Sequence, residues 1–125
     1  MHREKEIENL ASEFAQCQKI LLALGDANRL HMILEMMQMN ECAGVRVNAI
    51  KEKTHLSRPA VSHHLQILKD AGVLKMRREG TKNYYYFDPD MKSFKLLIDV
   101  LQNAVEIASE LPDRSAALQN AEEGF

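Results

Sequence analysis

The sequence contains no tryptophan, only two cysteines and no long apolar run. The cysteines, Cys17 and Cys42, form no CxxC pair and are too few for a disulfide framework. No stretch approaches the roughly 18 consecutive apolar residues that a membrane-spanning helix needs. Residues 1–6 lead into an amphipathic pattern and not into a signal-peptide core. We therefore expect a cytoplasmic protein with no membrane segment.

Residues 56–74 carry the most informative pattern, because they combine helix boundaries with an unusual polar face. Ser57 is a natural N-cap, Pro59 falls in the first turn where its missing N–H costs little, and Gly72 follows the end as a C′ residue. The apolar residues recur at i, i+4 and i+7: Val61, Leu65 and Leu68. The other face has hydrogen-bonding side chains and no acid: Arg58, Ser62, His63 and Gln66. Such a face is typical of a surface that recognises a polar, anionic partner.

Residues 47–54 predict a shorter helix, joined to the first by the connection 55–57. Two short helices joined in this way form a helix-turn-helix, whose second helix enters the major groove of DNA. His55 replaces the usual turn glycine, and histidine tolerates a positive φ better than most residues. Residues 75–87 contain two β-prone runs around Glu79-Gly80, which predict a hairpin with a basic tip. A helix-turn-helix followed by such a hairpin is a winged helix.

The distribution of charge favours a nucleic-acid partner, although the net charge of −2 alone argues weakly against one. Residues 46–82 contain nine basic and three acidic residues, so this segment carries +6 and the remaining chain −8. The basic residues lie on the motif that would face phosphate, which is the pattern expected of a DNA-binding domain. The alternative is a chance scatter of basic residues over solvated faces.

The rest of the chain predicts three further helices, at residues 4–24, 27–39 and 89–111, the second capped by Asp26. The expected inward residues of the first helix are Ile7, Leu10, Phe14, Cys17, Leu21 and Leu24. Those of the second are Leu30, Ile33, Leu34 and Met37, and those of the last are Leu97, Val100, Ala104, Ile107 and Leu111. We expect a mainly α-helical single domain over residues 1–112 with a small β-hairpin wing, and a frayed tail at 113–125.

The first and last helices offer more apolar surface than a compact winged helix needs. A homodimer that packs them across a two-fold axis would bury the surplus. The residues expected at this interface are Leu10, Phe14, Leu97, Val100 and Ile107. In the alternative, both stripes close on the core of the single chain.

Several stretches resemble the ArsR/SmtB family of bacterial repressors. Residues 22–30 are similar to the junction of its first two helices, and residues 56–74 are similar to its recognition helix almost throughout. Arg77–Gly80 followed by Tyr84-Tyr85 resembles its wing, and the similarity as a whole covers roughly residues 18–90. The resemblance implies a winged-helix homodimer that binds an inverted-repeat operator in double-stranded DNA and is released by an inducer.

The sequence departs from the family at the positions where the family binds metals. The resemblance implies a Cys-x-Cys pair at the start of the helix before the recognition helix, but those positions hold Arg46 and Asn48, and Cys42 lies upstream. A second site of the family takes aspartate and histidine from each last helix; here Asp99 is present, and no histidine follows His64. We therefore expect no metal at these sites and no other cofactor, and the inducer is not identified.

The candidate DNA contacts lie on the recognition helix and the wing. The resemblance implies that the positions of Arg58, Ser62 and His63 face the groove, and their helical spacing agrees. Arginine can fork onto guanine, and Gln66 can pair with adenine if it reaches. Ser57, Ser62 and the start of the helix, which includes Pro59, can also hold a phosphate. The basic residues of the wing are expected to contact the DNA backbone or the minor groove: Arg77, Arg78 and Lys82. His64 either contacts the groove or turns inward to a backbone partner.

An enzyme is not expected, because the histidines near the motif have no positioned carboxylate or cysteine partner. Two alternatives to simple repression stay open. The winged helix could serve as a protein-interaction module, which binding to random duplex DNA would distinguish. The protein could also be a thiol-responsive repressor through Cys42, with or without Cys17. A bridge between the two cysteines requires Cα atoms within about 7 Å.

Overall fold

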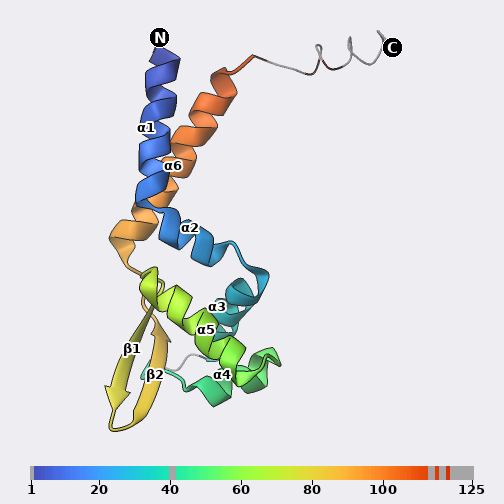
Figure 1. Ribbon diagram of the computed structural model, residues 1–125, viewed down its shortest axis with the longest axis vertical. Helices are drawn as coiled ribbons and strands as arrows, with labels where there is room; N and C mark the ends of the chain where they lie inside the picture. Colours follow the sequence, from blue (N-terminus) through green and yellow to red (C-terminus); the bar gives the residue numbers. More distant parts are fainter. Residues whose placement is uncertain (1, 40–41, 113–114, 116–117, 119–125) are drawn as a thin grey trace.

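The computed structural model describes residues 2–39, 42–112, 115 and 118, within which the chain forms six α-helices and a two-stranded hairpin. In order, the elements are α1 (His2–Gln16), α2 (Gln18–Leu24), α3 (Ala27–Met39), α4 (Val47–Thr54), α5 (Arg58–Asp70), β1 (Leu74–Glu79), β2 (Lys82–Phe87) and α6 (Met91–Glu110). Figure 1 shows α2–β2 as one unit, from which α1 and α6 project side by side as an arm. No helix in the described part of the chain is long and apolar enough to cross a membrane.

The helix-turn-helix is formed by α4 and α5, as predicted. The connecting residue His55 has φ 59°, so it adopts the left-handed conformation usually given to glycine at this turn. Ser57 caps α5, and its Oγ accepts a hydrogen bond from the amide of Ala60 at 3.3 Å. The local signals at this turn therefore agree with the fold.

The predicted hairpin is also present, with Glu79 paired to Lys82 around the Gly80-Thr81 loop. A short third segment joins it, because Val45 and Tyr85 exchange two backbone hydrogen bonds of 2.7 and 2.8 Å. The preceding Gly44 has φ +101°, and a Cβ there would lie 3.0 Å from the Cβ of Tyr84. Only glycine allows the chain to pass so close to β2, and this passage fastens the segment before α4 to the wing.

The predicted single helix over residues 4–24 is wrong, because the chain breaks at Cys17 into α1 and α2. Cys17 has φ −109° and ψ 16°, and its amide bonds the carbonyl of Phe14 in a tighter turn. After the break, α2 buries Ile20 and Ala23, and Leu21 is 36% exposed. The physical reason is that α1 packs along α6 whereas α2 packs on α5, α3 and α6, so one straight stripe cannot serve both.

Two smaller expectations are also corrected. α3 buries Met32, Ile33 and Met36, whereas Leu30, Leu34 and Met37 are exposed. Apolar residues occupy so much of this helix that periodicity does not select its inner face, and packing against α4, α5 and β2 does. The last helix begins at Met91 and ends at Glu110, since Asp90 and not Pro89 marks its start as the N-cap. The predicted tail at 113–125 falls mostly outside the described residues.

The core lies under α5. Val61, Leu65 and Leu68 have no exposed surface, so the whole apolar side of this helix is covered. Their neighbours in the same apolar cluster come from α3, α4 and the start of β1, namely Met32, Ile33, Met36, Ile50, Val73 and Leu74. Burial of one side holds α5 so that its polar side faces outward.

Candidate nucleic-acid interface

The outward face of α5 carries the residues that the sequence predicted. Arg58, Ser62, His63 and Gln66 are all exposed. Among the described residues, neither the Ser62 hydroxyl nor the His63 ring makes a hydrogen bond within the chain. Gln66 donates from Nε2 to Asp70 Oδ1 at 2.9 Å, which leaves its amide oxygen available. The face therefore presents donors and acceptors to a partner along about two helical turns.

Arg58 is held in place from the neighbouring helix. Its Nη1 donates to Oδ1 of Asn48, in the first turn of α4, at 2.7 Å. A guanidinium has five N–H donors in a planar fork, so this single bond orients the group and leaves most donors available. Sequence reasoning named Asn48 only as the replacement of a metal ligand and missed this positioning role.

The three basic residues predicted at the wing differ in their contacts, and the exposed side chain of Lys82 makes no hydrogen bond or ion pair within the described part of the chain. Arg77 donates from Nε to the carbonyl of Ala43 at 2.7 Å, pairs through Nη1 with Glu79 at 2.9 Å, and lies 4.3 Å above the ring of Tyr84. Arg78 makes one bond, from Nε to the carbonyl of Gly80 at 3.1 Å. Arg77 thus ties the wing to the segment before α4, and DNA contact by these residues stays a prediction.

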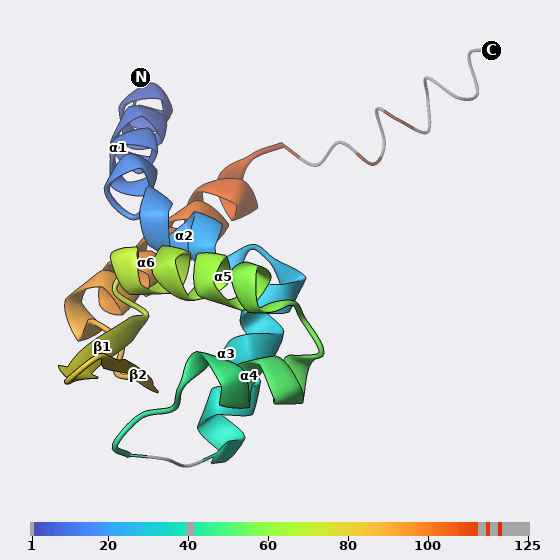
Figure 2. The ribbon, with the colours of Figure 1, turned by 60° about the horizontal axis from the view of Figure 1, so that its bottom comes forward.

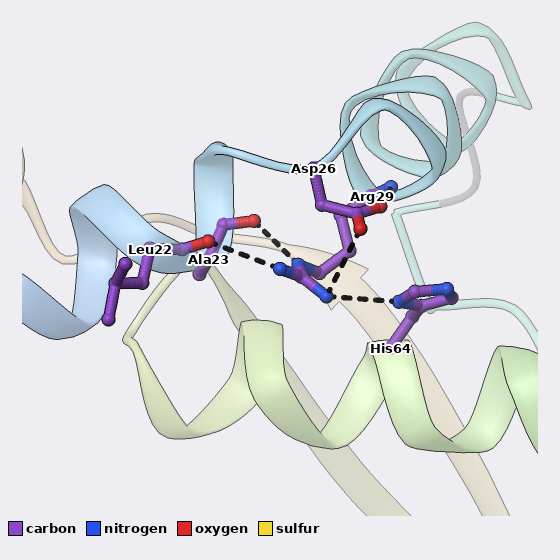
Figure 3. A network of polar contacts seen from close by, with 5 residues as sticks. All are labelled: Leu22, Ala23, Asp26, Arg29 and His64. Atoms are coloured by element: carbon purple, nitrogen blue, oxygen red, sulfur yellow. Dashed lines mark hydrogen bonds and ion pairs between the residues drawn. The ribbon is translucent and has the colours of Figure 1, made fainter.

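His64 turns inward, one of the two orientations that the sequence left open. Its Nδ1 lies 3.2 Å from Nη1 of Arg29, on α3 (Figure 3). Arg29 also donates to the carbonyls of Ala23 and Leu22, at 2.7 and 3.1 Å, in the last turn of α2, where carbonyl groups have no partner further along the helix. One guanidinium therefore joins the end of α2, the start of α3 and the underside of α5. The partner is a side chain and not the backbone that was expected.

Asp26 completes this network as the predicted cap of α3. Its Oδ1 accepts a hydrogen bond from the amide of Arg29 at 3.1 Å, and its Oδ2 lies 3.9 Å from Nη1 of Arg29. The hydrogen bond from the backbone amide of Arg29 is the main reason why the pKa of Asp26 is lowered. Burial lowers the pKa of His64, and Arg29 and His63 add to this against the opposing effect of Asp26. A neutral His64 can accept the bond from Arg29. The spacing Asp26-x-x-Arg29 is the only sequence signal for this network.

The other end of the recognition helix is fastened to α6. The amide of Asp90, the N-cap of α6, donates to the carbonyl of Gly72 at 2.8 Å. Close by, Nζ of Lys75 pairs with Asp88 at 2.7 Å, and this hydrogen bond raises the pKa of Lys75. The chain just after α5 therefore bonds the start of α6, and α5 itself contacts Arg29 of α3 through His64.

The residues predicted at a dimer interface pack largely within the chain. Val100 has no exposed surface and Leu97 is 8% exposed, while Leu10, Phe14 and Ile107 are half-buried. Asn103 of α6 also donates to Glu13 of α1 at 2.9 Å, so the two helices are joined in one protomer. An interface role for these five residues stays a prediction. The outward side of α6 exposes a different apolar stripe: Ile98, Leu101 and Val105.

The two candidate redox residues lie in different surroundings. Cys17 is 3% exposed, and its Sγ lies 3.6 Å from the carbonyl of Phe14. Cys42 is exposed and adjoins Ala43, whose carbonyl accepts the bond from Arg77 of the wing. In the described part of the chain, no three His, Cys, Asp or Glu side chains are grouped as metal ligands usually are. Arg46 and Asn48 are both exposed at the start of α4.

Comparisons with known proteins point to one group. A family model described as "Family of unknown function (DUF7342)" matches residues 25–125. An uncharacterised HTH-type transcriptional regulator of Methanocaldococcus jannaschii is 39% identical over 90 residues, which are 71% of this chain and 98% of that protein. The HTH-type transcriptional repressor SmtB of Mycobacterium tuberculosis is 31% identical over 90 residues, 72% of this chain and 63% of the longer relative.

A solved structure extends this similarity to three dimensions. It is the homodimeric winged helix-turn-helix DNA-binding domain of a possible ArsR-family transcriptional regulator from Mycobacterium bovis. It superposes with a TM-score of 0.55 at 29% identity, over 77% of this chain and 84% of that one. The relatives are thus transcriptional regulators, and the shared part includes the helix-turn-helix and the wing.

Proposed function

We propose that the chain, a member of the ArsR/SmtB family of winged-helix transcriptional regulators, is a repressor that binds an inverted-repeat operator as a homodimer. It also belongs to the family of unknown function (DUF7342), whose model it matches. The observation that carries the proposal is the exposed polar face of α5 formed by Arg58, Ser62, His63 and Gln66; the acid beside it, Asp70, lies at the end of the helix and is bonded to Gln66. A helix with one buried side and a face of this kind suits the major groove, where base edges offer donors and acceptors.

The charge of the neighbouring elements supports the same partner. The segment 46–82 carries +6 and includes exposed Arg78 and Lys82 on the wing. Such a segment attracts the phosphate backbone on both sides of the groove that α5 would enter. Base contacts by α5 would then give sequence preference, and the basic wing would give affinity.

The apolar stripe on α6 supports the dimer. Ile98, Leu101 and Val105 are 56, 46 and 67% exposed and follow one another at i, i+3 and i+7. Burying such a side chain fully contributes about 1.5–3 kcal/mol. In a two-fold dimer formed by α6, these residues would be buried on both chains. The arm is also joined to α5 through Gly72 and Asp90, so pairing of two arms would fix the separation of two recognition helices.

The proposal excludes one class of inducer and does not identify the inducer itself. We propose that it is not a metal at the two sites that the family resemblance implies, because Arg46 and Asn48 occupy one and no histidine accompanies Asp99 at the other. Adding zinc, cadmium or arsenite to the protein–operator complex should leave the affinity unchanged. Release at micromolar metal would contradict this part of the proposal. Release by mild oxidant that Cys42→Ser abolishes would favour the thiol-responsive alternative.

Selection of DNA fragments from a random pool tests the main proposal. Enriched sequences should contain two inverted half-sites whose centres lie about 34–36 Å apart. Sedimentation should give two chains per duplex, and affinity should fall with salt at a log–log slope of about −0.9 per neutralised phosphate. Failure to enrich any sequence, together with salt-independent association, would favour the protein-interaction module.

A further inference from the structure

A small cleft opens between the helix-turn-helix and the wing. Its volume is about 90 Å³, which is room for several water molecules or one compact group. It is lined by the first residues of α4 and α5 and by the wing: Arg46, Val47, Asn48, Arg58, Thr81 and Asn83. The cleft therefore lies where the base-reading helix meets the element expected beside the DNA backbone.

The lining has the chemistry of an anion site. It offers two guanidinium groups, one hydroxyl and two amides, and none of the lining residues is acidic. The Arg46 side chain makes no hydrogen bond or ion pair with the described part of the chain, and Arg58 is bonded only to the neutral Asn48. Within the described residues, neither of these two positive charges at the cleft has an acidic partner. Arginine is well suited to binding a phosphate by two parallel hydrogen bonds.

Asn83 is the residue that separates this cleft from an ordinary basic surface. Its Oδ1 is buried and has no hydrogen-bond partner among the described residues, which is costly in a folded protein. The oxygen and nitrogen of an asparagine amide exchange places by a simple flip, so the same position can hold a donor. The buried position itself is out of reach of a ligand, so the side chain would have to rotate its NH₂ group into the cleft, where Asn83 would bond an anion held by Arg46 and attracted by the charge of Arg58.

Hydrogen bonds of the backbone and of Arg58 hold the sides of the cleft in place. The two hydrogen bonds between Val45 and Tyr85 bring Arg46 beside β2, where Asn83 lies two residues earlier. The bond from Arg58 to Asn48 holds the other side of the cleft. The donors are therefore fixed before a ligand arrives, which lowers the entropic cost of binding.

We propose that this cleft is a phosphate-binding site that holds one phosphodiester group of the operator in each half-site. The inference rests on the proposed function, because it names further residues of the same DNA-binding surface: Arg46 and Asn83, which sequence reasoning did not assign. A phosphate held between α4, α5 and the wing sets the register in which α5 enters the groove. Its contribution to affinity is independent of sequence.

The sharpest variant is Asn83→Asp, which keeps the shape of the side chain and adds a negative charge. In the free protein the new carboxylate lines the same cleft as Arg46 and Arg58, whose positive charges favour it, so the melting temperature should stay nearly equal. On DNA it repels the phosphate, so affinity for the selected operator should fall by at least about tenfold. If Asn83 had only a structural role, Asn83→Asp would lower the melting temperature and the operator affinity together, and that result would overturn the inference.

Arg46→Gln is the second variant, and Lys53→Gln is its matched control, because Lys53 is an exposed base of α4 that does not line the cleft. Arg46→Gln should weaken binding to selected and to random DNA by the same factor and make the salt slope shallower by about one phosphate. Lys53→Gln should have a smaller effect on both. Equal effects of the two substitutions would count against the cleft.

Operators in which single phosphates are replaced by neutral methylphosphonates locate the contact. One position in each half-site should weaken binding of the wild-type protein but have no further effect on Arg46→Gln. If every position weakens both proteins equally, the cleft holds no phosphate. Wild-type protein that enriches no DNA sequence would refute the proposed function, whereas wild-type binding with no loss in the cleft variants would refute only this inference.

Discussion

The helix-turn-helix with its wing and the arm formed by α1 and α6 expose opposite kinds of surface. On α5 and the wing most exposed side chains are polar or basic, with Asp70 and Glu79 as acids among them, and several make no bond within the described part of the chain. On the arm, exposed isoleucine, leucine and valine form a stripe along α6: Ile98, Leu101 and Val105. In Figure 2, α1 and the end of α6 extend away from β1, β2 and α4, and the hydrogen bond from Asp90 to Gly72 joins the start of α6 to the chain just after α5.

The difference indicates two different partners. A charged, hydrogen-bonding surface gains little from an apolar partner, because desolvating unpaired polar groups is costly. An exposed apolar stripe gains most from a similar stripe, as in a second copy of the chain. If the proposals are right, the arm determines how many recognition helices reach the DNA and the winged helix determines which sequence they prefer.

The largest expected effect comes from preventing the arms of two copies from pairing while leaving the winged helix intact. In the double variant Leu101→Glu and Val105→Glu, two copies would have to bury unpaired charges against each other, which is strongly unfavourable. The protein should be monomeric, and operator affinity should fall by two or more orders of magnitude because each complex loses the second half-site. Sedimentation and fluorescence anisotropy measure the two effects.

The matched control is Leu34→Glu, which replaces an exposed leucine of α3 that lies outside the arm. It should keep both the dimer and the affinity. A monomeric arm variant that binds the operator with wild-type affinity would show that the apolar stripe on α6 serves no dimer. Loss of the dimer in Leu34→Glu would instead move the interface to α3.

Base reading by α5 is the next effect in size. Substitution of Arg58 by Ala should cost roughly 1–3 kcal/mol on the selected operator and relax the preference at one base pair. Asn48→Ala should reproduce part of this loss, because it removes the bond that orients the guanidinium. The readout is affinity for a panel of single-base operator variants. Equal weakening on selected and random DNA would mean that Arg58 contacts phosphate and reads no base.

The sequence predicted the winged helix well because its signals are local. Ser57, His55 and the hairpin around Gly80 each act within a few residues, so their structure follows from their own chemistry. The break at Cys17 and the inner face of α3 depend on which helices pack together, and an apolar pattern is compatible with more than one packing. Bonds between distant residues, such as Arg29 with His64 and Arg77 with Ala43, leave no periodic signal at all.

A smaller effect separates the basic residues within the wing. Arg78→Ala and Lys82→Ala should each make the salt slope shallower by up to about 0.9, with little change in sequence preference. Arg77→Ala should act mainly on the wing itself, because it loses bonds to Ala43 and Glu79 and the contact with Tyr84. A loss of about 1 kcal/mol of stability is expected. A reduction of the salt slope without any loss of stability would return Arg77 to the DNA-contacting set.

The smallest effect concerns the contact beneath the recognition helix. Burial lowers the pKa of His64 in the folded protein, so the unfolded chain, with an ordinary pKa of about 6.5, takes up the proton first. The free energy of unfolding contributed by this site is therefore complete above about pH 6.5 and decreases as the pH falls from there to the folded pKa. Protonated His64 would also place a cation against Arg29 and could no longer accept its bond. His64→Gln retains an acceptor for Arg29 but does not titrate. Denaturant unfolding from pH 8 to 5 should show a steeper loss of stability for wild type than for His64→Gln, and parallel curves would mean that the contact with Arg29 does not depend on a neutral His64.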